Sequence, residues 1–77
     1  MPENAIEMRA EWAGRIATVH VAAGAAVEPG QEVVTIEAMK MLTALTAPRA
    51  GTVSEILVRE DEFVDAGAVL VRIAWSS

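Results

Sequence analysis

The sequence contains two similar halves. When it is compared with itself at an offset of about 37 positions, glycines and apolar residues fall on one another repeatedly. The identical pairs are Gly14 and Gly51, Val21 and Val58, Val27 and Val64, Gly30 and Gly67, Val34 and Val71, and Ile36 and Ile73. The alignable stretches run from Ile6 to Glu37 and from Thr43 to Ala74, so Lys40 lies at their midpoint. Repeats this short are expected to merge their cores into one unit with approximate two-fold symmetry, which exposes the joint that holds Lys40.

The composition favours one small domain with an aliphatic core. The chain has 77 residues, of which 53% are hydrophobic, with one Phe, two Trp and no Tyr. We therefore expect a single domain over residues 1–77, with little chain available for a deep catalytic cleft. The sequence has no cysteine, which excludes disulfide and thiolate-metal scaffolds, and its net charge of -5 opposes binding to nucleic acid or anionic membranes. Because it shows neither a signal-peptide pattern nor the roughly 20 apolar residues of a membrane span, the cytoplasm is the expected location.

Short runs rich in Val, Ile and Thr alternate with Gly, Pro and Asp, a pattern typical of an all-β sandwich or barrel. Four strands are predicted in each half: Ala5 to Arg9, Arg15 to Val21, Ala26 to Glu28, Glu32 to Glu37, Leu42 to Thr46, Thr52 to Val58, Phe63 to Asp65 and Val69 to Ala74. In the second strand of each half the apolar alternation is broken once, between Ile16 and Val19 and between Val53 and Ile56. A bulge there would let the strand cross between two sheets, which predicts a closed sandwich.

Turn residues recur at equivalent places in both halves. Pro29 presets φ at about -65°, and Gly30 supplies the positive φ that a type II turn requires. Gly67 has the same place in the second half. Gly24 corresponds to Asp61, a residue that tolerates the left-handed region better than most. The two halves are therefore expected to turn in the same way.

The joint between the halves is predicted to be a tight hairpin with Met39 and Lys40 as its central residues. Two-residue hairpins favour primed turns, in which both central residues have positive φ and Asn or Gly is usual. Met and Lys there imply local strain, which tends to persist where function needs it. The structural alternative is an ordinary solvated lysine. Large apolar side chains at a tip bury little, however, and this favours an adaptable docking surface.

The run from Glu37 to Met41, which reads Glu-Ala-Met-Lys-Met, resembles the signature of biotinyl (biotin carboxyl carrier) domains. The similarity extends from about Ile6 to Ala74, and its other motifs are the turn at Pro29 to Gln31, the Ala-Pro-x-x-Gly segment at Ala47 to Gly51 and the Val-x-x-Gly pattern at Val64 to Gly67. The resemblance implies a flattened barrel-sandwich hybrid of two four-stranded antiparallel sheets. It also implies that a biotin protein ligase recognises Glu37, Ala38, Met39 and Met41 and attaches biotin covalently to Lys40.

The same resemblance implies a carrier that is not itself an enzyme. Biotin on Lys40 would shuttle CO2 as carboxybiotin between a biotin carboxylase and a carboxyltransferase, the subunits that perform the chemistry. Compared with the family pattern, Leu42 stands where an acidic residue is common, and Asp61 replaces a frequent glycine. The additional loop, or thumb, of some acetyl-CoA carboxylase carriers is absent.

Two alternatives stay open. A lipoyl-type acyl carrier would share the fold and the lysine, although lipoyl domains usually carry Asp-Lys-Ala at this turn. An unmodified structural or adaptor domain would use the hairpin only for binding. Catalysis by the chain itself is disfavoured because its single histidine, His20, lies in a predicted strand without an obvious Ser, Cys or paired carboxylate partner. The acidic run from Glu60 to Glu62 is expected to be a solvated loop and not a metal site.

Strand direction predicts that Trp12 lies beside the Lys40 hairpin. If both termini lie at the opposite end, the loop from Ala10 to Ala13 and the loop from Arg59 to Glu62 both reach the Lys40 end. The repeat copy of Trp12 is Arg49, so the two-fold symmetry breaks at this position. Trp12 is expected either to cap the end of the sandwich or to take part in recognition of a partner.

Overall fold

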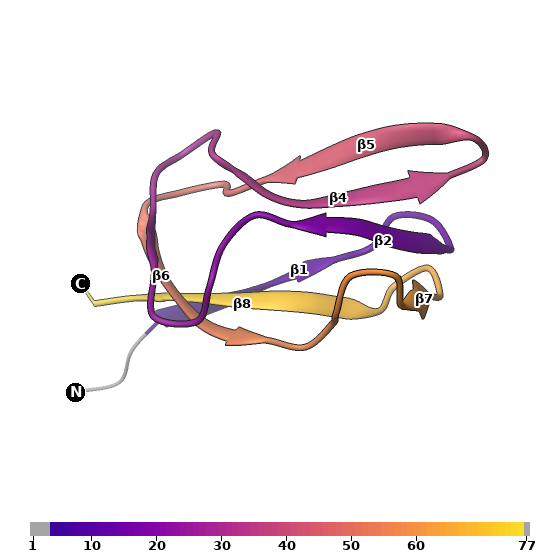
Figure 1. Cartoon of the computed structure of the whole chain (residues 1–77). Coiled ribbons are helices and arrows are strands. Elements are labelled where there is room, and N and C mark those ends of the chain that lie inside the picture. The colour runs from indigo at the N-terminus through magenta and orange to yellow at the C-terminus, as the bar shows by residue number, and fades with distance from the viewer. Residues whose placement is uncertain (1–3, 77) are drawn as a thin grey trace.

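The computed structural model describes residues 4–76, which form eight strands in two four-stranded antiparallel sheets (Figure 1). The strands are β1 (Asn4–Arg9), β2 (Gly14–Val19), β3 (Ala26–Val27), β4 (Glu32–Ala38), β5 (Met41–Thr46), β6 (Gly51–Ile56), β7 (Phe63–Val64) and β8 (Val69–Trp75). The domain expected over 1–77 extends past this range by residues 1–3 and 77, which lie outside the described residues. No helix within 4–76 has the length and hydrophobicity required to span a membrane.

The sheets confirm the predicted pseudosymmetry. One sheet has the strand order β1-β8-β6-β3 and the other has the order β5-β4-β2-β7. Exchanging each strand for its copy in the other half converts one order into the other. Each sheet takes two strands from each half, so neither half can complete a sheet alone. The fold is the two-sheet flattened barrel that the family resemblance implies.

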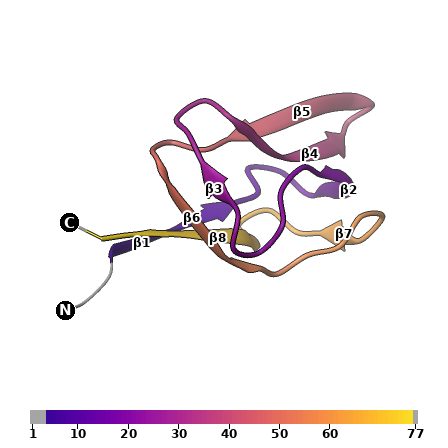
Figure 2. The ribbon, with the colours of Figure 1, turned by 60° about the vertical axis from the view of Figure 1, so that its left-hand side comes forward.

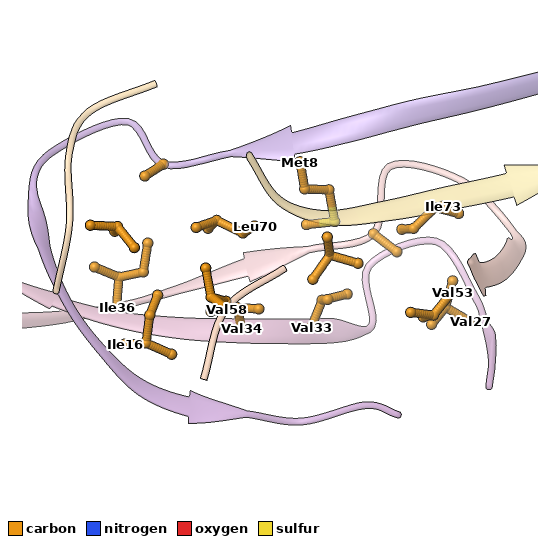
Figure 3. Close-up of a cluster of buried hydrophobic side chains, with 14 residues drawn as sticks. Met8, Ile16, Val27, Val33, Val34, Ile36, Val53, Val58, Leu70 and Ile73 are labelled. Carbon is orange, nitrogen blue, oxygen red and sulfur yellow. The ribbon is translucent and has the colours of Figure 1, made fainter. Parts of the chain in front are cut away.

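Apolar side chains from both halves form one core between the sheets (Figure 3). Its fully buried members are mostly β-branched, as the aliphatic composition predicts. Strict alternation along the strands is broken at Val33–Val34 in β4 and at Leu70–Val71 in β8, where both neighbours are buried. The largest of them are Ile16, Leu70, Ile73, Val27, Val33, Val34, Val53 and Val71. Among residues 4–76 no polar or charged side chain is buried. Burial of apolar surface is therefore the main stabilising contribution.

The predicted irregularity of β2 and β6 is confirmed, but the prediction that each of these strands crosses from one sheet to the other at its bulge is wrong. The register shifts between Ile16 and Thr18 in β2, and between Val53 and Glu55 in β6. Both strands nevertheless stay in one sheet and end two residues earlier than predicted. After β2 and β6 the chain passes to the other sheet only in the segments 20–25 and 57–62, which follow these strands. Val58 is buried although it lies beyond the end of β6. Apolar spacing in a sequence indicates which residues are buried but not which residues pair in a sheet, so the predicted strand was too long.

The turns have the predicted geometry. Gly30 and Gly67 have φ angles of 83° and 89°, and each is the third residue of a four-residue turn. The backbone N–H of Gln31 donates to the Glu28 carbonyl at 3.1 Å, which closes the first of these turns. Gly24 and Asp61 also share positive φ, at 91° and 73°. The substitution of glycine by aspartate therefore conserves the turn.

The molecule is elongated, with extents of 42 × 18 × 17 Å. Both described ends of the chain lie at one end, and the β4–β5 hairpin projects from the other (Figures 1 and 2). The two pictures differ by a 60° turn and agree on this arrangement. The fold therefore presents Lys40 at the end opposite to the two described chain ends, which is the arrangement that the predicted position of Trp12 assumes.

Candidate functional site

The turn between β4 and β5 holds Lys40 in a conformation that lysine rarely adopts. Ala38 pairs with Met41 across the hairpin, which leaves Met39 and Lys40 as the central residues. Their φ angles are 53° and 64°, as expected for a primed turn. A left-handed conformation costs about 1–2 kcal/mol for a residue with a side chain. The pairing of β4 with β5 offsets this cost. Because the pairing continues up to Ala38 and Met41, it also holds the two central residues of the turn in a fixed position.

Lys40 is exposed, and within residues 4–76 its ammonium makes no hydrogen bond or ion pair. Met39 and Met41 on either side are 86% and 67% exposed. Lys40 is also the only lysine in the sequence, a signal that the sequence analysis missed although a residue count shows it. Any reaction directed at a lysine side chain therefore has a single target in this chain.

Gly14 brings β2 against the hairpin end of β4. A Cβ at this position would lie 2.5 Å from the Glu37 carbonyl oxygen, 2.9 Å from Ile36 Cγ2 and 3.0 Å from Ala38 Cβ. The first two distances are shorter than real Cβ contacts and the third is very tight, so the close approach of β2 to β4 requires glycine. Its repeat copy, Gly51, has the equivalent relation to Ala74, whose carbonyl oxygen would lie 2.8 Å from the added Cβ.

An ion network ties Glu37 to the loop between β6 and β7. Arg15 donates to Glu37 Oε1 at 2.6 Å and to Asp61 Oδ1 at 2.7 Å. The hydrogen bond with Glu37 is the largest cause that raises the pKa of Arg15 above its ordinary value. All three side chains are substantially exposed, so the network contributes little to stability and acts mainly by fixing positions.

The network joins residues of both halves and has no counterpart at the symmetry-related position of the fold. The repeat copies of Arg15, Glu37 and Asp61 are Thr52, Ala74 and Gly24, none of which is charged. Glu37 and Arg15 belong to a cross-strand row that consists of Leu42, Glu37, Arg15 and Phe63. The equivalent row in the other sheet consists of Ala5, Ala74, Thr52 and Ala26. Since the fold accepts small residues in this row, the large and charged ones beside Lys40 are not required by the fold. The repeat alignment contained this signal, and the sequence analysis missed it.

Trp12 lies beside the hairpin, as strand direction predicts. Together with Ala38, Met39, Met41 and Thr43 it lines an apolar pocket of about 150 Å³. Trp12 is 54% exposed, so its side chain borders the open end of the sandwich and does not fill the core. Its part in recognition stays a prediction.

The loop from Arg59 to Glu62 also reaches this end. The Asp61 backbone N–H donates to the Ile16 carbonyl at 2.7 Å, and the Ile16 N–H donates to the Glu62 carbonyl at 2.8 Å. The Glu60 carboxylate accepts a hydrogen bond from a backbone amide of β2. No group of three or more potential metal ligands occurs within residues 4–76. The acidic run is accounted for by these local contacts.

His20 is far from a catalytic arrangement. Its Nε2 lies 2.7 Å from Thr35 Oγ1 and 3.7 Å from a Glu32 carboxylate oxygen. His20 lies one residue past the end of β2 and not within a strand as predicted. Thr35 and Glu32 both face the same ring nitrogen, so the carboxylate does not orient the imidazole from its other nitrogen as a catalytic triad requires.

Comparison with known proteins places the chain in a family. The family model described as "Biotin-requiring enzyme", of the biotin/lipoyl type, matches residues 5–73. The chain is 42% identical over 67 residues to the biotin/lipoyl attachment protein of Bacillus subtilis (strain 168), across 87% of this chain and 92% of that protein. Among solved structures, a single-chain, multi-domain long-chain acyl-CoA carboxylase matches 95% of this chain with a TM-score of 0.86 and 32% identity, although the match covers 7% of the carboxylase. The lipoyl domain of the 2-oxoglutarate dehydrogenase complex from Azotobacter vinelandii matches with a TM-score of 0.76 and 29% identity, over 84% of this chain and 82% of that domain. The chain belongs to the biotin/lipoyl attachment family.

Proposed function

We propose that this chain is a biotin carboxyl carrier in which Lys40 holds biotin in amide linkage. The observation that carries the proposal is the display of Lys40, the only lysine, at an exposed primed turn between two methionines. An amide-linked group requires an accessible primary amine, and Lys40, which is exposed and has no partner among residues 4–76, fits this requirement. When bound, biotin supplies a ureido nitrogen that takes up CO2 at a biotin carboxylase and releases it at a carboxyltransferase. The chain itself is proposed to catalyse neither transfer.

The residues around Lys40 would present it to a biotin protein ligase. The ligase removes a proton from the ammonium, and the amine then forms the amide with biotinyl-adenylate as AMP leaves. Glu37, Ala38, Met39 and Met41 are the proposed recognition residues, with Glu37 held in place by Arg15. A rigid turn lowers the entropy lost when the ligase or a carboxylase subunit orients the lysine. Tethering then replaces free diffusion by a local search.

Biotin is favoured over a lipoyl group by the methionines on both sides of Lys40 and by the structural likeness to an acyl-CoA carboxylase. The likeness to a lipoyl domain makes a lipoyl-type acyl carrier the main alternative. An unmodified adaptor domain is the other alternative. The proposal treats residues 1–77 as one carrier domain that works in the cytoplasm with separate carboxylase and transferase partners.

Mass spectrometry after co-expression with a biotin protein ligase tests the proposal. We expect an increase of about 226 Da, whereas a lipoyl group would add about 188 Da and an adaptor would show no change. Trypsin cleaves after Lys40 only while its amine is free, so the modified chain should yield an intact 16–49 peptide. Lys40→Arg is the matched control, because a guanidinium stays protonated and cannot accept the acyl group. Biotin incorporated into this variant would contradict the assignment.

The carrier role needs a second measurement. The biotinylated chain is incubated with a biotin carboxylase, ATP and labelled bicarbonate, and the protein-bound acid-labile label is counted. We expect label on the biotinylated chain and none on the Lys40→Arg chain. A fully biotinylated chain that no biotin carboxylase labels would argue against CO2 transfer while leaving attachment intact.

A further inference from the structure

We propose that the pocket lined by Trp12, Ala38, Met39, Met41 and Thr43 is an intramolecular resting site for the arm that Lys40 carries. The inference rests on the proposed function of Lys40 as the attachment residue. The pocket would receive the apolar part of that arm, which for biotin is a five-carbon acyl chain that ends in a sulfur-containing ring.

The position of the pocket suits a tethered occupant. Met39 and Met41 both line it, and they are the immediate neighbours of Lys40. A group linked to the Lys40 amine therefore stays within reach of the pocket at all times. Short flexible tethers give effective concentrations of about 1 mM or more, so even a weak site is occupied part of the time.

The chemistry of the pocket suits an apolar occupant. Four of its five lining side chains are apolar, and the fifth is Thr43, which carries a methyl group beside its hydroxyl. The volume of about 150 Å³ equals that of roughly five liquid water molecules at ~30 Å³ each, which is the scale of a small ring. Methionine sulfur and an indole face also adapt well to an irregular, polarizable ligand.

The pseudosymmetry of the fold provides an internal comparison. The repeat copies of Ala38 and Trp12 are Trp75 and Arg49. At the end of the molecule that holds the termini, the Arg49 guanidinium stacks on the Trp75 ring, 3.8 Å from the ring centroid. At the Lys40 end, the position equivalent to Trp75 is occupied by Ala38, whose small side chain leaves open the space that the Trp75 indole fills at the other end. The pocket is therefore a product of side-chain choice at the Lys40 end and not of the shared backbone.

The test uses Trp12 as a reporter. Trp75→Phe leaves Trp12 as the sole tryptophan, and N-succinimidyl biotin loads Lys40 chemically as the sole lysine, without any ligase. Acrylamide quenching of Trp12 is compared before and after loading, and mass spectrometry confirms the acylated residue. We expect the quenching constant to fall about two-fold as the arm covers the indole. An unchanged quenching constant on the fully loaded chain would overturn the proposal.

Matched controls separate the arm from other effects. Loading with N-succinimidyl acetate removes the charge of Lys40 without adding an arm, so the same fall in quenching with acetate would refute the proposal. Lys40→Arg, acylated only at its N-terminal amine, should show no change. Thr43→Ile introduces the residue of the repeat copy, Ile6, into the pocket wall and should abolish the response. A full response in that folded variant would place the arm elsewhere.

A second measurement avoids the Trp75 substitution. In the wild-type chain the indole N–H signal of Trp12, identified with Trp12→Phe, is followed by NMR before and after loading. We expect this signal to shift and that of Trp75 to stay in place. Because loading is chemical, a chain that no biotin ligase modifies can still pass this test, so failure of the proposed function and failure of the pocket are distinguishable.

Discussion

Replacing Gly14 by alanine should destabilise the domain strongly through a single atom. The added Cβ would lie within 3.0 Å of three atoms of β4, one of which is a backbone carbonyl oxygen of a paired strand. Overpacking in a tight site costs about 1–3 kcal/mol, and contact with backbone favours the upper end of that range. A domain of 77 residues has a total stability of only about 4–12 kcal/mol. At about 4–8 °C for each kcal/mol, a loss of about 3 kcal/mol lowers Tm by roughly 12–24 °C.

Gly67→Ala is the matched control for this prediction. A Cβ there would meet no atom within 4 Å, so its cost is only the conformational one at a φ of 89°, about 1–2 kcal/mol. Thermal unfolding followed by circular dichroism, with urea titration as a second measure, compares the two variants. If Gly14→Ala proves no less stable than Gly67→Ala, the close approach of β2 to β4 is not what requires glycine.

Three further predictions concern the hairpin, the exposed indole and acid stability. Met39→Asn should raise Tm by a few degrees because Asn tolerates left-handed φ, while reducing biotin incorporation measured by intact mass; an unchanged Tm would show that the turn is unstrained. Trp12→Ala should change Tm little, since the residue is half exposed, but slow modification by the ligase or carboxylation; marked unfolding would assign Trp12 to the core. Hydrogen bonds from Arg72 hold the pKa of Glu7 below its ordinary value of 4.5, so the stability that this pair contributes is present above pH 4.5 and is lost as the pH falls through the lowered pKa. Glu7→Gln should therefore flatten the acid limb of a plot of Tm against pH, and an identical acid limb would contradict this assignment.

Features that depend on neighbouring residues could be predicted from the sequence. Positive φ at Gly30, Asp61 and Lys40 follows from local turn chemistry and from the offset between the repeats. The eight strands follow from apolar spacing, and their ends differ from the prediction by no more than two residues. The pseudosymmetry follows because the two halves have apolar residues and glycines at equivalent positions, and these residues pack and turn in the same way.

The place where the chain changes sheets could not be predicted in this way. The register shift at Ile16 marks a bulge, but a bulge alone does not say in which sheet the following residues pair. The pairing partners decide this. β2 ends at Val19, although the His20 backbone N–H still donates to the Val33 carbonyl at 2.8 Å, and the chain then turns at Gly24.

The sequence by itself determined that a single lysine stands at a strained turn between two similar halves, since composition, spacing and turn preference are all local properties. Strand direction also placed Trp12 at the hairpin end. Only the tertiary structure decided the ion network and the pocket around that lysine. Arg15 meets Asp61 across 46 positions, and Trp12 joins Ala38, Met39, Met41 and Thr43 in the lining of one pocket. Such contacts arise from the closure of the sandwich, in which each sheet is completed by strands of the other half, and no pattern within either half records them.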